Sequence, residues 1–285
     1  MSGIAAANPP KKHPVFRRRL WRGVLVCLIC LIYLTPFYVL TTISFKSPQD
    51  TSSMWQLPQY LYLDNFTNAW RDAWLGKALL NNALVTVFAV GILILLGSCA
   101  SYPLARYKTP LNRFMYTLFV SCLIVPQLTI LVPLYKIMAD LRAINQYWGI
   151  ILLHVTFFLP LTIFLYTGFI NTIPKELDES ALIDGCGKLS VFFRIIFPML
   201  KTITAAVTIL AGCSIWNDYQ FSIFFLNKRD VMTVTVALGQ FISQFQNNLH
   251  WVAAGCFVGM LPLAIVYLAL QKYFVKGMVE GAIKG

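Results

Sequence analysis

A short polar cluster interrupts an apolar stretch in the last third of the chain. Trp216, Asn217, Asp218 and Tyr219 follow one another there, and Asp218 is the one acidic residue expected well inside a membrane span. Flat aromatic faces beside amide and carboxylate groups suit a solute that has both apolar surface and groups that donate and accept hydrogen bonds. Ionisable groups inside spans tend to be functional. The cluster therefore predicts a substrate path, the alternative being that Asn217 and Asp218 cap or cross-link helices near the outer surface.

No catalytic or nucleotide-binding motif accompanies this cluster. The sequence lacks GxxxxGK[ST], HExxH, GxSxG and a clustered acid pair that would support catalysis. Cys27 and Cys30 form a CxxC, but no second pair completes a metal site. We interpret His154 as a hydrogen-bonded packing residue. The sequence thus predicts a non-catalytic chain with no metal or cofactor of its own.

A second candidate site is the polar segment 175–196, which lies between two apolar stretches. Pro174 suits a first helical turn, and the acids that follow complement the positive helix N-terminus; these are Glu176, Asp178 and Glu179. Gly185 and Gly187 should end this helix, and residues 189–196 should form a second one. Ala181 and Gly185 are one turn apart, which predicts a shallow notch for a partner's side chain. The alternative is a helix lying on lipid headgroups, which its acids disfavour.

This segment resembles the cytoplasmic loop of ATP-binding-cassette importer permeases. The pattern of that loop is Glu-Ala-Ala, three residues, Gly, nine residues, then Ile-x-Leu-Pro. The positions that match are Glu179, Ala181, Gly185, Ile195 and Pro198, whereas Ser180 and Phe197 depart from the pattern. The resemblance implies that an ATPase docks here, on Glu179, Ser180, Ala181, Asp184, Gly185, Ile195 and Pro198.

Nearly the whole chain is similar to the shorter of the two permease subunits of maltose-type carbohydrate importers. The residues that carry this similarity are Phe45-Lys46, Leu80-Asn81-Asn82, Tyr102, Arg106, Pro133-Leu134-Tyr135, Phe169 with Ile173-Pro174, and the 216–219 cluster, while Arg142-Ala143 replaces a usual Leu-Gly. Residues 277–285 resemble the glycine-rich tail that reaches between the ATPases. In that family the longer partner permease is an alternative source of direct ligand contacts.

This similarity implies the all-helical type I importer permease fold in a bacterial cytoplasmic membrane. It also implies four partners: a homologous second permease, two ATPase subunits that bind ATP and Mg²⁺, and an extracytoplasmic binding protein. The implied cargo is a sugar or oligosaccharide. Neither its size nor its charge follows from the sequence.

Composition independently indicates a membrane protein. The 285 residues are 58% hydrophobic and 12% charged, with a mean hydropathy of +0.67, whereas soluble domains carry about twice that charge. A spanning helix needs about 20 apolar residues. Six stretches meet this requirement: 20–45, 78–104, 114–135, 147–170, 202–226 and 251–274. We expect one polytopic domain over residues 20–285, preceded by a cytoplasmic tail over residues 1–19.

The basic residues predict the orientation of these spans. Of the 23 Lys and Arg residues, sixteen fall on the side that holds both termini and the 175–196 loop, and seven on the other. Cytoplasmic loops are enriched in Lys and Arg, so both termini should be cytoplasmic. The net charge of +12 then needs no nucleic acid to explain it.

Other features concern packing. Gly255 and Gly259 form a GxxxG, which lets two helices approach closely, either within the chain or between subunits. Pro126, Pro133 and Pro160 predict kinks in the third and fourth spans. The outer loop 46–77 is rich in aromatic residues, which mark either a membrane interface or a surface for an external partner.

Two other classes of function compete with an importer subunit. An intramembrane enzyme or an ion-driven secondary transporter would need several charged or paired polar residues at mid-membrane depth. The sequence offers Asp218 nearly alone. Taken together, these observations favour a permease subunit that forms a sugar path and couples to ATPases through the 175–196 loop.

Overall fold

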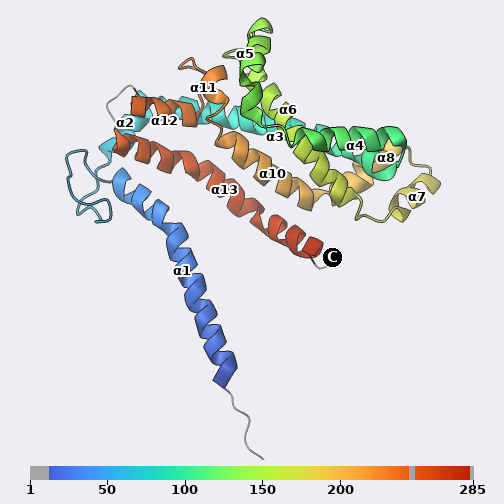
Figure 1. The fold of residues 1–285 in the computed structure, drawn as a ribbon, viewed down its shortest axis with the longest axis horizontal. Helices are drawn as coiled ribbons and strands as arrows, with labels where there is room; N and C mark the ends of the chain where they lie inside the picture. The colour runs from blue at the N-terminus through green and yellow to red at the C-terminus, as the bar shows by residue number, and fades with distance from the viewer. Residues whose placement is uncertain (1–12, 244–247, 283–285) are drawn as a thin grey trace, which may run out of the picture.

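The computed structural model describes residues 13–243 and 248–282, and all regular structure within them is helical (Figure 1). Four helices are long and apolar enough to cross a membrane: α1 (His13–Ser44), α3 (Leu75–Arg106), α6 (Tyr147–Ile170) and α13 (Leu249–Ala282). Two bent helix pairs bring the number of possible crossings to six. This number agrees with the six predicted spans. One bent pair covers the third predicted span, whereas the other joins Lys188–Met199, most of which was predicted to lie in the polar loop, to α10.

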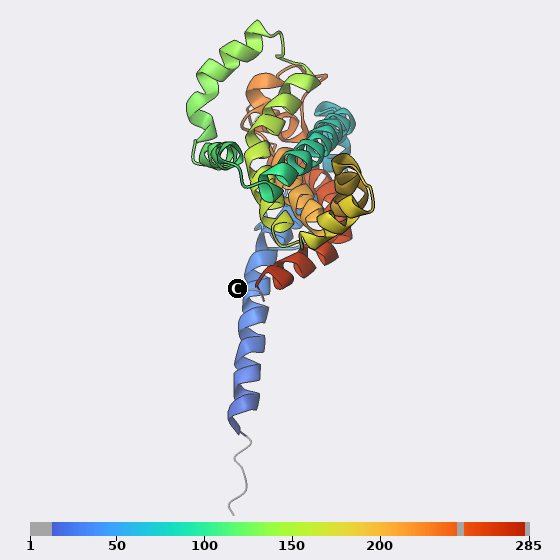
Figure 2. The same cartoon turned by 90° about the vertical axis from the view of Figure 1, so that its right-hand side faces the viewer.

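The third predicted span is broken in its middle. Helix α4 (Pro110–Cys122) is followed by the 3₁₀ turn η1 (Gln127–Ile130) and α5 (Leu131–Asp140), at an angle of 91°. Pro126 explains the break, because it lacks an N–H and disfavours helical geometry in the residue before it. Figure 2 shows α4 and α5 arching away from the other helices. Pro160, by contrast, lies inside the unbroken α6.

The fifth predicted span ends earlier than expected. Helix α10 (Lys201–Trp216) stops before the polar cluster, and the short α11 (Ser222–Phe225) follows. The prediction that Asp218 lies well inside a span is therefore wrong, since Asp218 follows the last turn of α10. The physical reason is local: Asp218 accepts hydrogen bonds from the backbone N–H groups of Phe221 and Ser222, which starts a new helix.

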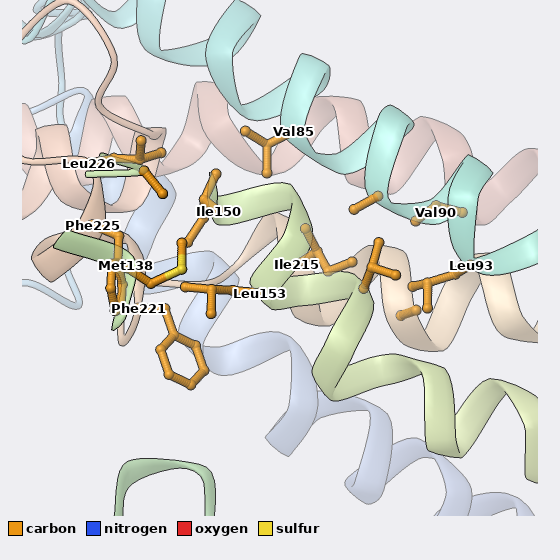
Figure 3. Packing of buried hydrophobic residues seen from close by; sticks show 14 of the residues in the cluster. Val85, Val90, Leu93, Met138, Ile150, Leu153, Ile215, Phe221, Phe225 and Leu226 are labelled. Carbon is orange, nitrogen blue, oxygen red and sulfur yellow. The ribbon is translucent and has the colours of Figure 1, made fainter. Parts of the chain in front are cut away.

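Helices α3 and α6 form the centre of the bundle. Gly97 allows their close approach, since a Cβ built there would lie 2.2 Å from Cγ2 of Thr162, and Ser101 donates a hydrogen bond to the Ile163 carbonyl at 3.1 Å. Apolar side chains from α3, α6 and α10 meet in one buried cluster, which includes Val85, Ile150 and Ile215 (Figure 3). This rigid centre positions the ends of the three helices.

The GxxxG of α13 makes its contact within the chain. A Cβ at Gly255 would lie 2.2 Å from Leu238, and one at Gly259 would lie 2.9 Å from Val234. Both partner residues belong to α12 (Val234–Ser243). Of the two alternatives left open by the sequence, the intrachain contact is therefore the one observed. Helix α13 then continues to Ala282, so the described part of the predicted C-terminal tail, residues 277–282, extends this helix.

Helix α1 leaves the bundle along much of its length (Figures 1 and 2). The most apolar part of the helix is not buried within the chain. At its end, Asn65 of α2 (Asp64–Asp72) donates hydrogen bonds to the carbonyls of Ser44 and Lys46. Lys46 is 2% exposed, and its ammonium donates hydrogen bonds to the Ser52 hydroxyl and to the Ser53 carbonyl. These hydrogen bonds order the loop after α1, from which Trp55, Tyr60, Trp70 and Trp74 project with large exposed faces.

Candidate functional sites

The polar segment after α6 begins with α7 (Glu176–Ile183), which a buried ion pair fixes to the end of α3. Arg106 Nη2 lies 2.8 Å from Asp178 Oδ2, with side chains 6% and 10% exposed. The Tyr102 hydroxyl donates to the other Asp178 oxygen at 2.5 Å. Arg106 also donates to the carbonyls of Ile170 and Ile173 at the end of α6. Three helices are therefore joined at this one point.

The end of α7 explains why glycine stands at position 185. Gly185 has φ +84°, its N–H bonds the Leu182 carbonyl, and the N–H of Cys186 bonds the Ala181 carbonyl. This double pattern is a Schellman motif, in which a left-handed residue ends the helix. The predicted notch is wrong, because Ala181 is buried in the core and Gly185 lies beyond the helix. A Cβ at Gly185 would meet nothing within 4 Å.

An exposed apolar surface surrounds this turn instead. It consists of Leu177, Leu182, Ile183, Leu189 and Phe193, of which Ile183 is 86% and Leu189 76% exposed. Three of the residues predicted to dock an ATPase are exposed on the same segment: Glu179, Ser180 and Asp184. We call these five apolar residues the docking surface, after the role that the sequence predicts for this segment. These residues were not predicted from the sequence, because an exposed Leu or Ile is indistinguishable from a lipid-facing one in an apolar sequence.

The second predicted helix of this segment is irregular. Helix α8 (Lys188–Val191) passes into a π turn, η2 (Phe192–Ile196), and then into α9 (Phe197–Met199). Pro198 has no N–H to donate to the Arg194 carbonyl, so the regular hydrogen-bond ladder is interrupted there. Ile195 is half-buried beneath this turn and Pro198 is exposed. Helix α10 then departs at 71° from the preceding helical stretch.

The polar cluster of the sequence borders a cavity of about 440 Å³. The cavity lies where the break before α5, the middle of α6 and the end of α10 meet. Its lining residues are Gln127, His154, Phe157, Phe158, Ser214, Asn217, Asp218, Tyr219, Gln220 and Phe221. Three of the four predicted path residues are therefore on the cavity.

Asp218 is the most firmly held of these residues. Its carboxylate accepts from the N–H of Phe221 at 3.1 Å, the N–H of Ser222 at 2.8 Å and the Ser222 hydroxyl at 2.7 Å. Thr235 of α12 donates to its backbone carbonyl at 2.6 Å. Asp218 thus caps a helix, which is the alternative role that the sequence offers for it. The same side chain also lines the cavity. Tyr219, 45% exposed, covers the cavity margin and contacts Gly239.

Trp216 does not reach the cavity. Its side chain is 8% exposed, and its indole N–H donates to the Gly259 carbonyl at 3.0 Å. Asn82 of α3 donates to the Trp216 carbonyl at 3.0 Å. These bonds tie the end of α10 to α3 and α13. Trp216 therefore supports the site from behind and offers no stacking face to a solute.

His154 reaches the cavity from α6. Its side chain is 3% exposed, and Nε2 has no hydrogen-bond partner among the described residues. The nearest acid is Asp218, whose Oδ2 lies 3.8 Å away. The prediction that His154 is simply a hydrogen-bonded packing residue is wrong for this nitrogen. Within the described residues, no group of three His, Cys, Asp or Glu side chains could hold a metal ion.

Comparison with known families and proteins gives a consistent result. A model of the family described as "Binding-protein-dependent transport system inner membrane component" matches residues 93–280. The chain is 46% identical to the melibiose/raffinose/stachyose import permease protein MelC of Bacillus subtilis, over 92% of this chain and 95% of that protein. It is 34% identical to the multiple sugar-binding transport system permease protein MsmG of Streptococcus mutans, over 93% and 96% of the two chains.

A solved structure has the same fold. A chain of a bacterial ABC transporter involved in the import of the acidic polysaccharide alginate superposes with a TM-score of 0.77, covering 94% of this chain and 100% of that one. The sequence identity is 20%. This likeness concerns the fold alone.

Proposed function

The chain belongs to the family of binding-protein-dependent transport system inner membrane components, and we propose that it imports oligosaccharides of the melibiose and raffinose type. As a member, it is a multi-pass, non-catalytic permease subunit of a sugar importer. The observation that carries the proposal is 46% identity over 92% of the chain to a permease named for melibiose, raffinose and stachyose. A permease that shares nearly its full length is expected to share its class of cargo.

The cavity beside Asp218 is proposed as this subunit's part of the sugar path. Its lining combines aromatic faces with amide, hydroxyl and carboxylate groups, which is the combination that sugars require. Asn217, Asp218 and Tyr219 belong to it, and Gln127 and His154 complete it. The break at Pro126 supports this role, because irregular backbone at membrane depth is tolerated where it lines a water-filled cavity.

The docking surface is proposed as the contact with an ATPase. Exposed apolar residues beside a polar rim suit a protein partner, and they include Ile183 and Leu189. The Arg106–Asp178 pair would transmit force, since it joins α7 directly to α3 and its guanidinium holds the end of α6. ATP bound by the partner would shift the permease between inward- and outward-facing states by favouring one of them.

The remaining proposals concern assembly. We infer a second, homologous permease, two ATPases that carry ATP and Mg²⁺, and a binding protein on the outer side. Both termini and the docking surface would lie in the cytoplasm. Sixteen of the 23 basic residues support this orientation.

A reconstitution experiment tests the cargo. The chain, its second permease, the ATPases and the binding protein are placed in liposomes, and uptake of labelled melibiose and raffinose is measured with ATP inside. We expect ATP-dependent accumulation of both sugars, and stimulation of ATP hydrolysis when the loaded binding protein is added. Accumulation of other sugars, with neither melibiose nor raffinose entering, would contradict the proposed cargo and leave the family assignment intact.

A further inference from the structure

Among the described residues that line the cavity, His154 has a buried nitrogen, Nε2, that lacks a hydrogen-bond partner. Nε2 is buried, has no partner in the described structure and is 3.8 Å from Asp218 Oδ2. Buried polar groups are nearly always hydrogen-bonded, so an orphan of this kind needs an explanation. The cavity gives one, because both side chains line it.

The spacing of the two atoms fits one bridging oxygen. A separation of 3.8 Å is too long for a direct hydrogen bond, whereas an oxygen in the gap can lie about 2.8 Å from each atom. A hydroxyl accepts from the imidazole N–H and donates to the carboxylate at the same time. A carboxylate or an ammonium ligand cannot do both. We therefore propose, on the basis of the sugar path described above, that His154 and Asp218 together bind a hydroxyl group of a neutral saccharide.

Aromatic rings complete a site of this kind. Phe157 and Phe221 stack at 5.0 Å between ring centres with 15° between their planes, which fixes one wall beside His154. Tyr219 offers an exposed ring at the margin. Sugar rings pack their apolar faces on such surfaces while their hydroxyls meet polar groups.

The charges of the lining define which saccharides fit. Asp218 is the one acidic residue among those that line this cavity, and they include no Lys or Arg. Its carboxylate is fixed by Phe221 and Ser222, so it cannot turn away from a negative ligand. A uronic acid would bring a second negative charge close to it. The site therefore selects neutral sugars over acidic ones.

The test uses the whole assembled transporter. Native cysteines are removed, Ser214→Cys places a thiol on the cavity wall, and uptake by this complex is verified first. A hydrophilic maleimide then labels the thiol while raffinose or digalacturonate is added at rising concentration. The variants are His154→Phe, which keeps a ring without polar atoms, and His154→Gln, which retains a hydrogen-bond donor. Thr156→Val is the control, because Thr156 is an exposed α6 residue outside the cavity.

We expect raffinose to slow labelling in the parent, in Thr156→Val and in His154→Gln. In His154→Phe half-protection should need about tenfold more raffinose, which corresponds to the loss of one hydrogen bond. Labelling without sugar should stay unchanged, which shows that the cavity is intact. Digalacturonate should protect poorly throughout.

Two results would overturn the inference, and they differ. Equal protection by raffinose in the parent and in His154→Phe would mean that a water, not the sugar, bridges the pair, while the cavity remains the path. No protection in any variant, in a complex that still transports raffinose, would place the sugar path elsewhere and would overturn both the path and this pair.

Discussion

The Arg106–Asp178 pair is the residue-scale feature that fixes the polar segment 175–196 to the helix bundle. Both side chains are almost wholly buried, and burying two charges is costly unless their geometry satisfies both. Here Tyr102 and two carbonyls add hydrogen bonds, although Arg106 Nε and Nη2 and Asp178 Oδ2 have no partner of hydrogen-bond geometry among the described residues. The ion pair and these hydrogen bonds together hold α7 to the ends of α3 and α6.

Removing one member of the pair should be severe. Asp178→Ala leaves a buried guanidinium without its partner, and we expect a loss of about 3–5 kcal/mol of stability. Thermal unfolding of the detergent-solubilised complex measures it. Glu179→Ala is the matched control, since Glu179 is the adjacent acid and is exposed. An unfolding temperature for Asp178→Ala equal to that of Glu179→Ala would show that the pair is not stabilising.

The structure gives Gly185 a different role from the notch that the sequence predicts, because Gly185 ends α7 in a left-handed conformation. Its φ of +84° disfavours any side chain, although the space around it is open. Gly185→Ala should cost about 1–2 kcal/mol and loosen the end of α7, whereas Gly185→Asn should cost less, since Asn tolerates this conformation. Substrate-stimulated ATP hydrolysis should fall more in Gly185→Ala than in Gly185→Asn.

Gly187 supplies the control for this turn. It has open space around it and no positive φ, so Gly187→Ala tests the loss of a glycine without backbone strain. If Gly187→Ala and Gly185→Ala impaired hydrolysis equally, the backbone conformation would not be the cause.

At the scale of elements, the close contact of α3 and α6 depends on one glycine. Gly97→Val would clash with Thr162 and should cost about 1–3 kcal/mol through overpacking. Gly91→Val is the control on the same helix, because nothing lies within 4 Å of the Cβ position at Gly91. Thermal unfolding again gives the comparison. Thr162→Ala, which removes the clashing methyl group, should restore part of the loss in Gly97→Val and none in Gly91→Val.

The elements also show what the sequence could and could not predict. Spans with no break, such as α6 over 147–170, follow from apolar length alone, and the structure matches that prediction residue for residue. The break after α4 falls at Pro126, where the sequence predicts a kink, because proline lacks an N–H. The break at Asp218 was not predicted, because hydropathy does not register a capping carboxylate within a long apolar run. Similarly, Trp216 and Asp218 are only two positions apart. The position at which α10 ends places Asp218 on the cavity and Trp216 behind it.

At the scale of the whole molecule, the loops sort into two groups. Arg106 and Asp178 join the loops that follow the second and fourth spans at one end. At the other end, Arg229 donates to the Asp72 carbonyl, and Asn145 accepts from the N–H of Lys228. The loop that holds Lys228 and Arg229 thus contacts the other two loops expected outside. These three loops carry seven of the 23 basic residues. The contacts between loops and the distribution of Lys and Arg therefore sort the loops into the same two groups.

This division predicts the orientation of the permease in the cell. Leu61→Cys, on the outer loop, and Leu189→Cys, on the docking surface, replace side chains that are 72% and 76% exposed. In a complex without native cysteines, a membrane-impermeant maleimide should label Leu61→Cys in intact spheroplasts. Leu189→Cys should react only after permeabilisation. Because a docked ATPase would cover Leu189, Lys108→Cys on the adjacent exposed loop is a second reporter of the same side. Labelling of Lys108→Cys in sealed spheroplasts would reverse the orientation, and would place the docking surface where no ATP-bound partner could reach it.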